Sequence, residues 1–106
     1  MSASLQGALD LLILKTLARR PNHGFGITLH IQEASDNLLR VEEGSLYPAL
    51  HRLERDSLVT ADWATTPNGR RARLYTLTPA GRKRLREVEK SWGNLSSGVA
   101  KVLSFS

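Results

Sequence analysis

The sequence contains no cysteine. This absence excludes disulfides, thiolate zinc sites and cysteine nucleophiles, and it is typical of proteins that work in a reducing compartment. We therefore expect a cytoplasmic protein.

The chain has 106 residues with four prolines and eight glycines, and a chain of this length is expected to form one domain with a modest core.

Long apolar runs are also absent. The run LLIL (11–14) is flanked by Asp10 and Lys15, and no basic residue precedes it. A signal peptide would begin with basic residues, and a helix that spans a bilayer needs about 20 apolar residues. The sequence therefore predicts a soluble protein that does not enter the membrane.

The sequence has no recognisable combination of residues for catalysis or for metal binding. His23, His30 and His51 have no metal-ligand spacing, and no thiolate accompanies them. The sequence has no recognisable set of nucleophile, base and orienting group, and no glycine loop that would hold phosphates. We predict that the protein is not an enzyme and has no cofactor or metal site. His23 is expected to cap or pack at a helix entrance.

Negative charge is missing from residues 63–86, which carry seven Lys or Arg. The net charge of the whole chain is +5. Such an asymmetry favours contact of this part with a polyanion, through electrostatic attraction and counterion release. On charge alone, a solvated basic surface is an equal alternative.

Apolar residues with helical spacing are present from the start of the chain. They predict a helix over residues 4–19 that ends before Pro21, and a second helix over residues 25–35. The first helix is apolar on most sides, so part of its surface is expected to meet a partner chain.

A third helix is predicted over residues 44–56. Its apolar stripe consists of Leu46, Ala49, Leu50 and Leu53. With Ser45 or a neighbour as the cap, Pro48 would fall in the first turn, where its missing N–H needs no partner. The opposite face resembles a contact surface and carries Tyr47, Pro48, His51 and Arg55, with Arg52 beside it. Tyr47 and His51 could instead pack on the neighbouring hairpin, and Arg55 could form an ordinary ion pair.

Residues 58–78 predict a β-hairpin. Val59, Ala61 and Trp63 alternate on one strand, and TPNGRR (66–71) supplies the turn. Three arginines lie at the tip and on the returning strand, namely Arg70, Arg71 and Arg73. They are expected to contact phosphates or the minor groove, with a solvated turn as the alternative.

The last helix is predicted to begin with Thr78 as its cap and Pro79 at its first position, and to reach about residue 103. Its apolar residues are separated by gaps of 3, 4, 3, 4 and 3, which is a heptad seam. We expect a two-fold homodimer held by this seam and by the first helix, with packing inside one chain as the alternative. The predicted dimer residues are Leu5, Leu9, Leu12, Leu85, Val88, Trp92, Leu95, Val99 and Val102.

Together these elements predict a mainly α fold with a small β-hairpin. Residues 1–78 would form a winged helix-turn-helix domain and residues 79–106 a C-terminal dimerisation helix. In this architecture the third helix enters the major groove and the hairpin touches the DNA backbone or minor groove. The predicted DNA contacts are Ser45, Tyr47, Pro48, His51, Arg52, Arg55, Asn68, Gly69, Arg70, Arg71 and Arg73.

Four segments and one single residue resemble the PadR family of bacterial transcriptional regulators, in particular its short subclass. They are LQGALDLLILKTLA (5–18), PNHGFGI (21–27), VEEGSLYPALHRLE (41–54), RRARLYTLTPAGR (70–82) and Trp92 in the last helix. The third segment is the most specific, and Phe25 departs from the tyrosine usual in the family. The resemblance implies a homodimer, usually a repressor, on a pseudo-palindromic operator. It also implies a response to stress or to a small aromatic or lipophilic effector.

The role of Trp92 and the partner of the basic face each have two interpretations. Trp92 could belong to the dimer core, or it could line a space between subunits where a flat effector stacks. The basic face could dock on a protein instead of DNA, which would make the chain an interaction module. RNA is disfavoured as a partner because its deep, narrow major groove does not admit a helix.

Overall fold

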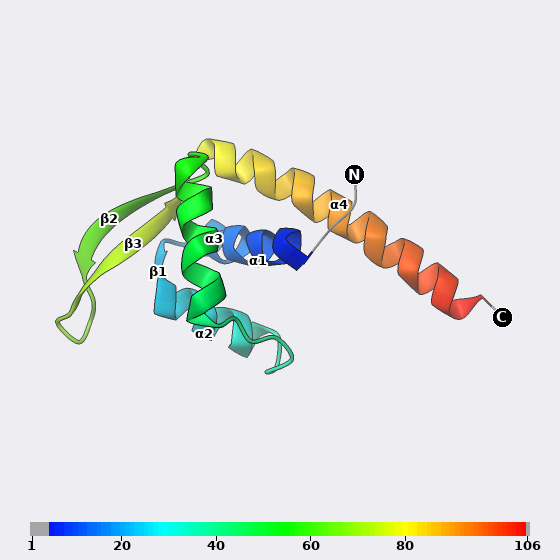
Figure 1. The fold of residues 1–106 in the computed structure, drawn as a ribbon, viewed down its shortest axis with the longest axis horizontal. Coiled ribbons are helices and arrows are strands. Elements are labelled where there is room, and N and C mark those ends of the chain that lie inside the picture. The colour runs from blue at the N-terminus through cyan, green and yellow to red at the C-terminus, as the bar shows by residue number, and fades with distance from the viewer. Residues whose placement is uncertain (1–4, 106) are drawn as a thin grey trace.

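The computed structural model describes the backbone of residues 5–105 and the side chains of residues 7–105. The elements follow in the order α1 (Leu5–Arg19), β1 (Asn22–His23), α2 (Gly24–Ala34), α3 (Glu43–Arg55), β2 (Val59–Thr65), β3 (Arg71–Leu77) and α4 (Pro79–Ser104). Helices α1, α2 and α3 form a compact body beside the hairpin of β2 and β3, and α4 extends from this body as a long arm (Figure 1). The predicted fold class is confirmed.

The core lies between the three helices of the body and the base of the hairpin. Leu46, Ala49, Leu50 and Leu53 are buried in it, as the predicted stripe of α3 requires. The apolar residues of α1 contribute Ile13, Leu14 and Leu17. The hairpin adds Val59, which pairs with Leu77 across the sheet.

The sheet contains a strand that the sequence did not predict. Its order is β1-β3-β2 with antiparallel pairing, and β1 places Asn22 opposite Tyr75 and His23 opposite Leu74. The expectation of a two-stranded hairpin was therefore incomplete. Two residues are too few to show the alternation that predicts a strand. Residues 22 and 23 form a strand only because they pair with β3, which is far away in the sequence.

The position of Pro48 corrects a second expectation. Helix α3 begins at Glu43, so Pro48 is its sixth residue and lies in the second turn, and Gly44 is inside the helix. Pro48 has no N–H to donate to the carbonyl of Gly44, four residues before it. The cap is Glu42, whose backbone is extended and whose side chain makes no capping hydrogen bond.

The start of α4 matches the prediction. The Thr78 hydroxyl oxygen accepts a hydrogen bond from the Gly81 N–H at 3.0 Å, and Pro79 occupies the first helical position. The same hydroxyl is within donating distance of the carbonyls of Ser57 (2.8 Å) and Leu58 (3.0 Å). These contacts attach the root of α4 to the chain just before the hairpin.

The seam of α4 becomes more exposed along its length. Leu85 is only 6% exposed because it joins the core of its own chain, so packing within one chain accounts for this end of the seam. Val88 and Trp92 are half-buried, and Leu95, Val99 and Val102 are exposed. On α1, Leu9 and Leu12 pack partly against the core, while the side chain of Leu5 lies outside the described residues.

Within residues 5–105, no helix is both long and apolar enough to cross a membrane.

Candidate nucleic-acid interface

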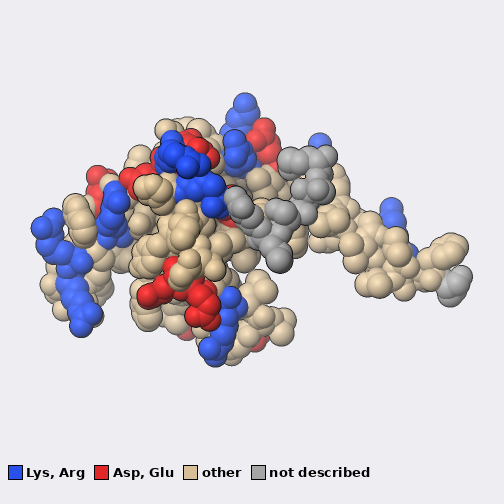
Figure 2. All heavy atoms as spheres, viewed as in Figure 1, with Lys and Arg blue, Asp and Glu red and all other residues tan. Residues whose placement is uncertain are grey.

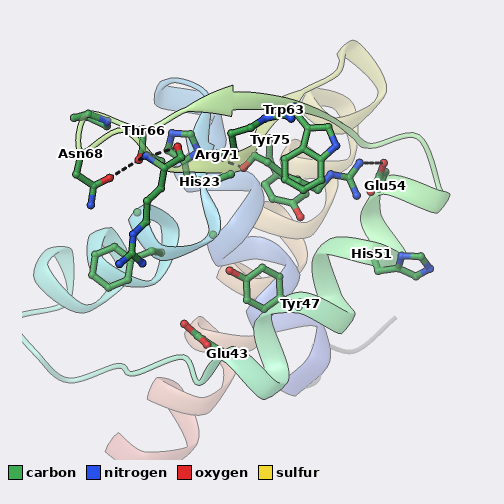
Figure 3. A pocket seen from close by; sticks show the side chains of 17 residues that line it. His23, Glu43, Tyr47, His51, Glu54, Trp63, Thr66, Asn68, Arg71 and Tyr75 are labelled. Carbon is green, nitrogen blue, oxygen red and sulfur yellow. Dashed lines mark hydrogen bonds and ion pairs between the residues drawn. The ribbon is translucent and has the colours of Figure 1, made fainter.

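An open groove of about 1240 Å³ lies between the wing, which is the hairpin of β2 and β3, and the outward face of α3. The first residues of α2 also border it. Figure 3 shows side chains from these elements converging on the space, with Trp63 above and Tyr47 below. We call this space the wing groove.

Helix α3 contributes one column of side chains to the wing groove. Glu43, Tyr47 and His51 follow one another at intervals of four residues, which places them on one face of a helix, and all three line the groove. Tyr47 is 46% exposed. A Cβ at Gly24 would lie 2.7 Å from the Tyr47 hydroxyl oxygen, so the glycine makes room for this ring at the start of α2.

The tip of the wing is a turn closed by the Thr66 N–H, which donates to the Arg70 carbonyl at 2.7 Å. Gly69 has a φ of +84°, a conformation that glycine adopts without a Cβ penalty. The Thr66 hydroxyl donates to the side chain of Asn68, which lines the wing groove. The turn holds Arg70 exposed at the groove's edge.

Arg71 lies over the ring of Trp63, with its guanidinium carbon 5.3 Å from the ring centroid. Such cation–π contact orients a guanidinium without neutralising it. Within residues 7–105, neither Arg70 nor Arg71 forms an ion pair with a carboxylate. Both cations are therefore available to an anion in the wing groove.

Arg73 also lines the wing groove but is already paired. Its guanidinium contacts the Glu54 carboxylate of α3 at 3.0 Å, with both side chains half-buried. A His23 ring nitrogen lies 3.3 Å from the Arg73 carbonyl. His23 thus packs at the entrance of α2 as expected, without forming a side-chain cap.

Arg52 is placed differently from its prediction. It turns toward α1 and pairs with Asp10, and both side chains are largely buried. This pairing uses the charge of a residue that was predicted to contact DNA. Burial raises the pKa of the Asp10 carboxyl above its ordinary value, and the nearby Arg52 lowers it without offsetting the burial.

The remaining predicted contacts lie at the rim or away from the wing groove. Ser45, Pro48 and Gly69 are exposed but do not line it. Arg55 is exposed and lies 3.6 Å from Asp56, the ion pair considered as its alternative.

Several groove residues were not predicted from the sequence. The main ones are Glu43, Glu54, Trp63 and Phe25. The spacing of four residues between Glu43 and Tyr47 was a signal that could have identified Glu43. Nothing in the sequence indicates that Trp63 stacks with Arg71, because that contact depends on the register of the hairpin.

The charges around this site are divided. Figure 2 shows basic side chains over the end of the wing and acidic side chains over the start of α3. Among the described residues, no group of three His, Asp or Glu side chains could hold a metal ion.

Comparison with known proteins gives consistent matches. The model of the Transcriptional regulator PadR-like family matches residues 13–87. The transcriptional regulator Rv3488 of Mycobacterium tuberculosis is 39% identical over 94 residues, which cover 89% of this chain and 84% of that protein.

Solved structures are similar over nearly the whole chain. A PadR family transcriptional regulator from Eggerthella lenta is 32% identical, with a TM-score of 0.76 over 95% of this chain and 86% of that one. A transcriptional regulator from Clostridium thermocellum is 26% identical, with a TM-score of 0.82 over 92% and 94%.

Proposed function

Because this chain belongs to the PadR-like family of transcriptional regulators, which bind DNA and are not enzymes, we propose that it is a homodimeric repressor of a pseudo-palindromic operator. The observation that carries the proposal is the wing groove. It combines two wing arginines that have no carboxylate partner among the described residues with an aromatic and polar face on α3. A surface of this kind suits a duplex, whose phosphates need cations and whose base edges need polar and apolar partners.

Each side of the wing groove has its own task in this proposal. Arg70 and Arg71 contact phosphates, and α3 enters the major groove with Tyr47 and His51 toward the base edges. The start of α2 borders the same space, and the first N–H groups of a helix favour a phosphate. Arg73 acts as a link between wing and α3 through its ion pair with Glu54.

A second copy of the chain would cover the exposed end of α4. Leu95, Val99 and Val102 repeat with heptad spacing, and Val102 is 74% exposed. A seam of this kind is stabilised by a matching seam on another helix. A two-fold dimer would place two α3 helices in successive turns of the major groove, about 34 Å apart. Residues 1–78 then act as the reading domain and residues 79–106 as the dimerisation helix.

We further propose that an effector binds near Trp92. This ring is half-buried, between the buried start of the seam and its exposed end. A flat aromatic or lipophilic molecule could stack there once a second α4 closes the space. Its binding would change the separation of the two α3 helices and release the operator.

Fluorescence anisotropy tests the function. The protein is titrated onto labelled duplexes that tile the DNA upstream of its own gene, with scrambled competitor and at several salt concentrations. We expect one tile to bind about 10³-fold tighter than scrambled DNA, at two chains per site, with affinity that falls steeply with salt. Equal weak binding to every tile, with no site found by a genome-wide selection, would favour the alternative of a protein-docking module.

A further inference from the structure

We propose that Glu43 is a specificity-determining residue that recognises cytosine in each half-site, at a cost in affinity for DNA in general. This inference rests on the proposed DNA-binding function. It gives a role in recognition to an acidic residue on a surface that would face a polyanion.

The position of Glu43 supports the assignment. It is the first residue of α3 and lines the wing groove below Tyr47 and His51 on the same helix face (Figure 3). The first turn of a recognition helix is the part that approaches the base edges most closely. The carboxylate is therefore placed where a base can reach it.

The charge of Glu43 is not used elsewhere in the described chain. Glu54, the other acid of the wing groove, is neutralised by Arg73 at 3.0 Å. Among the ion pairs and side-chain hydrogen bonds of residues 7–105, none involves Glu43. An unpaired carboxylate facing a polyanion is repelled by its phosphates, so it needs a donor on the DNA to offset that cost.

Cytosine supplies the matching donor. An ionised carboxylate only accepts hydrogen bonds, and the N4 amino group of cytosine is a donor at the major-groove edge. Guanine presents two acceptors there and thymine one, so both would face the carboxylate with like partial charge. Adenine presents the N7 acceptor beside its N6 donor, so it is a poorer partner for a carboxylate than cytosine.

A purely structural role for Glu43 is the competing explanation. A negative charge in the first turn of a helix is favourable because it meets the positive end of the helix dipole. Glu42 shares this setting: it precedes Glu43, is exposed and is the N-cap without a side-chain cap hydrogen bond. Glu42 does not line the wing groove. Glu42→Gln is therefore a matched control with the same change of charge at the same helix end.

The test is selection of binding sites from a pool of random duplexes by the full-length wild type, Glu43→Gln and Glu42→Gln. Thermal melting first verifies that both variants are as stable as the wild type. We expect the wild type and Glu42→Gln to select the same motif, with a strongly preferred cytosine at one position in each half-site. With Glu43→Gln, the preference for cytosine at that position should fall about tenfold, the scale of one good base contact, while the other positions persist.

Three results would overturn the inference while leaving the proposed function intact. Glu43→Gln could select the wild-type motif unchanged, Glu42→Gln could lose the same cytosine, or the wild-type motif could contain no preferred cytosine. A wild type that selects no motif at all would instead reject the proposed function, and this inference with it.

Discussion

The arginines around the wing groove differ in what each already contacts. Arg52 and Arg73 are paired with Asp10 and Glu54, so their charges contribute to the fold. Arg70 is exposed and unpaired among the described residues, and Arg71 is oriented by the ring of Trp63. Electrostatic attraction to DNA should therefore come mainly from the two arginines at the wing tip.

Arg70→Ala should weaken binding to every duplex and lower the dependence of log K on log salt by about one unit, because one phosphate contact is lost. Anisotropy at several salt concentrations measures both effects. Lys90→Ala is the control, since Lys90 is also an exposed cation but lies on α4, outside the wing groove and outside the predicted DNA contacts. An unchanged salt slope in Arg70→Ala would remove the wing tip from the phosphate contacts.

Asp10 gives the fold a defined dependence on pH. Its pKa in the folded chain is raised above 3.8, so the folded state keeps a proton that the unfolded chain has lost. The stability contributed by Asp10 should therefore decrease as pH rises from below 3.8 through the raised pKa. Urea unfolding of the wild type and Asp10→Asn at a series of pH values measures it. The free energy of unfolding of the wild type minus that of the variant should decrease with pH, and an increase would contradict the assignment.

At the scale of elements, the root of α4 packs closely against the chain before the hairpin. A Cβ at Gly81 would lie 2.1 Å from the Leu58 carbonyl oxygen and 2.5 Å from Leu77 Cδ1. A close approach to backbone cannot be relieved by a side-chain rotation. Glycine is therefore needed here for space, although its backbone conformation is helical.

Gly81→Ala should lower the free energy of unfolding by about 1 to 3 kcal/mol, the usual cost of forcing extra volume into a packed site. Gly93→Ala is the matched control, because it lies in the same helix and its Cβ would meet nothing within 4 Å. That change should stabilise the helix by up to about 1 kcal/mol. Urea unfolding compares the two, and equal effects would show that space at Gly81 is not limiting.

Elements set by local chemistry were predictable from the sequence. The stripe of α3 follows from leucine spacing, and the start of α4 follows from the preference of Thr and Pro for the first positions of a helix. Strand β1 and the pairing of Arg52 with Asp10 were not predictable, because both depend on partners far away in the chain. The start of α3 was misjudged because Pro48 was assumed to mark the first turn.

At the scale of the whole molecule, α4 is an arm with an uncovered apolar end. The molecule measures 56 × 29 × 23 Å, and the exposed residues of the seam lie in the C-terminal half of α4. A single chain leaves this surface in water. The proposed dimer would remove it from water.

Val99→Asp should convert the proposed dimer into monomers, because each chain would have to bury an unpaired carboxylate in the seam. Analytical ultracentrifugation measures the mass, and circular dichroism checks that the fold is retained. Ser97→Asp is the control, since residue 97 is exposed and lies away from the seam. Dissociation by both variants, or by neither, would argue against this seam as the interface.

The joint at Thr78 also determines what kind of signal the molecule could transmit. One residue separates β3 from α4, and its hydroxyl is bonded to the chain that precedes β2. The angle between wing and arm is therefore set by short-range contacts, and the Arg73–Glu54 pair fixes the wing against α3. Each chain of the proposed dimer should therefore move as one rigid body. A ligand bound between the two α4 helices would then change the distance between the two α3 helices without altering the surface of either.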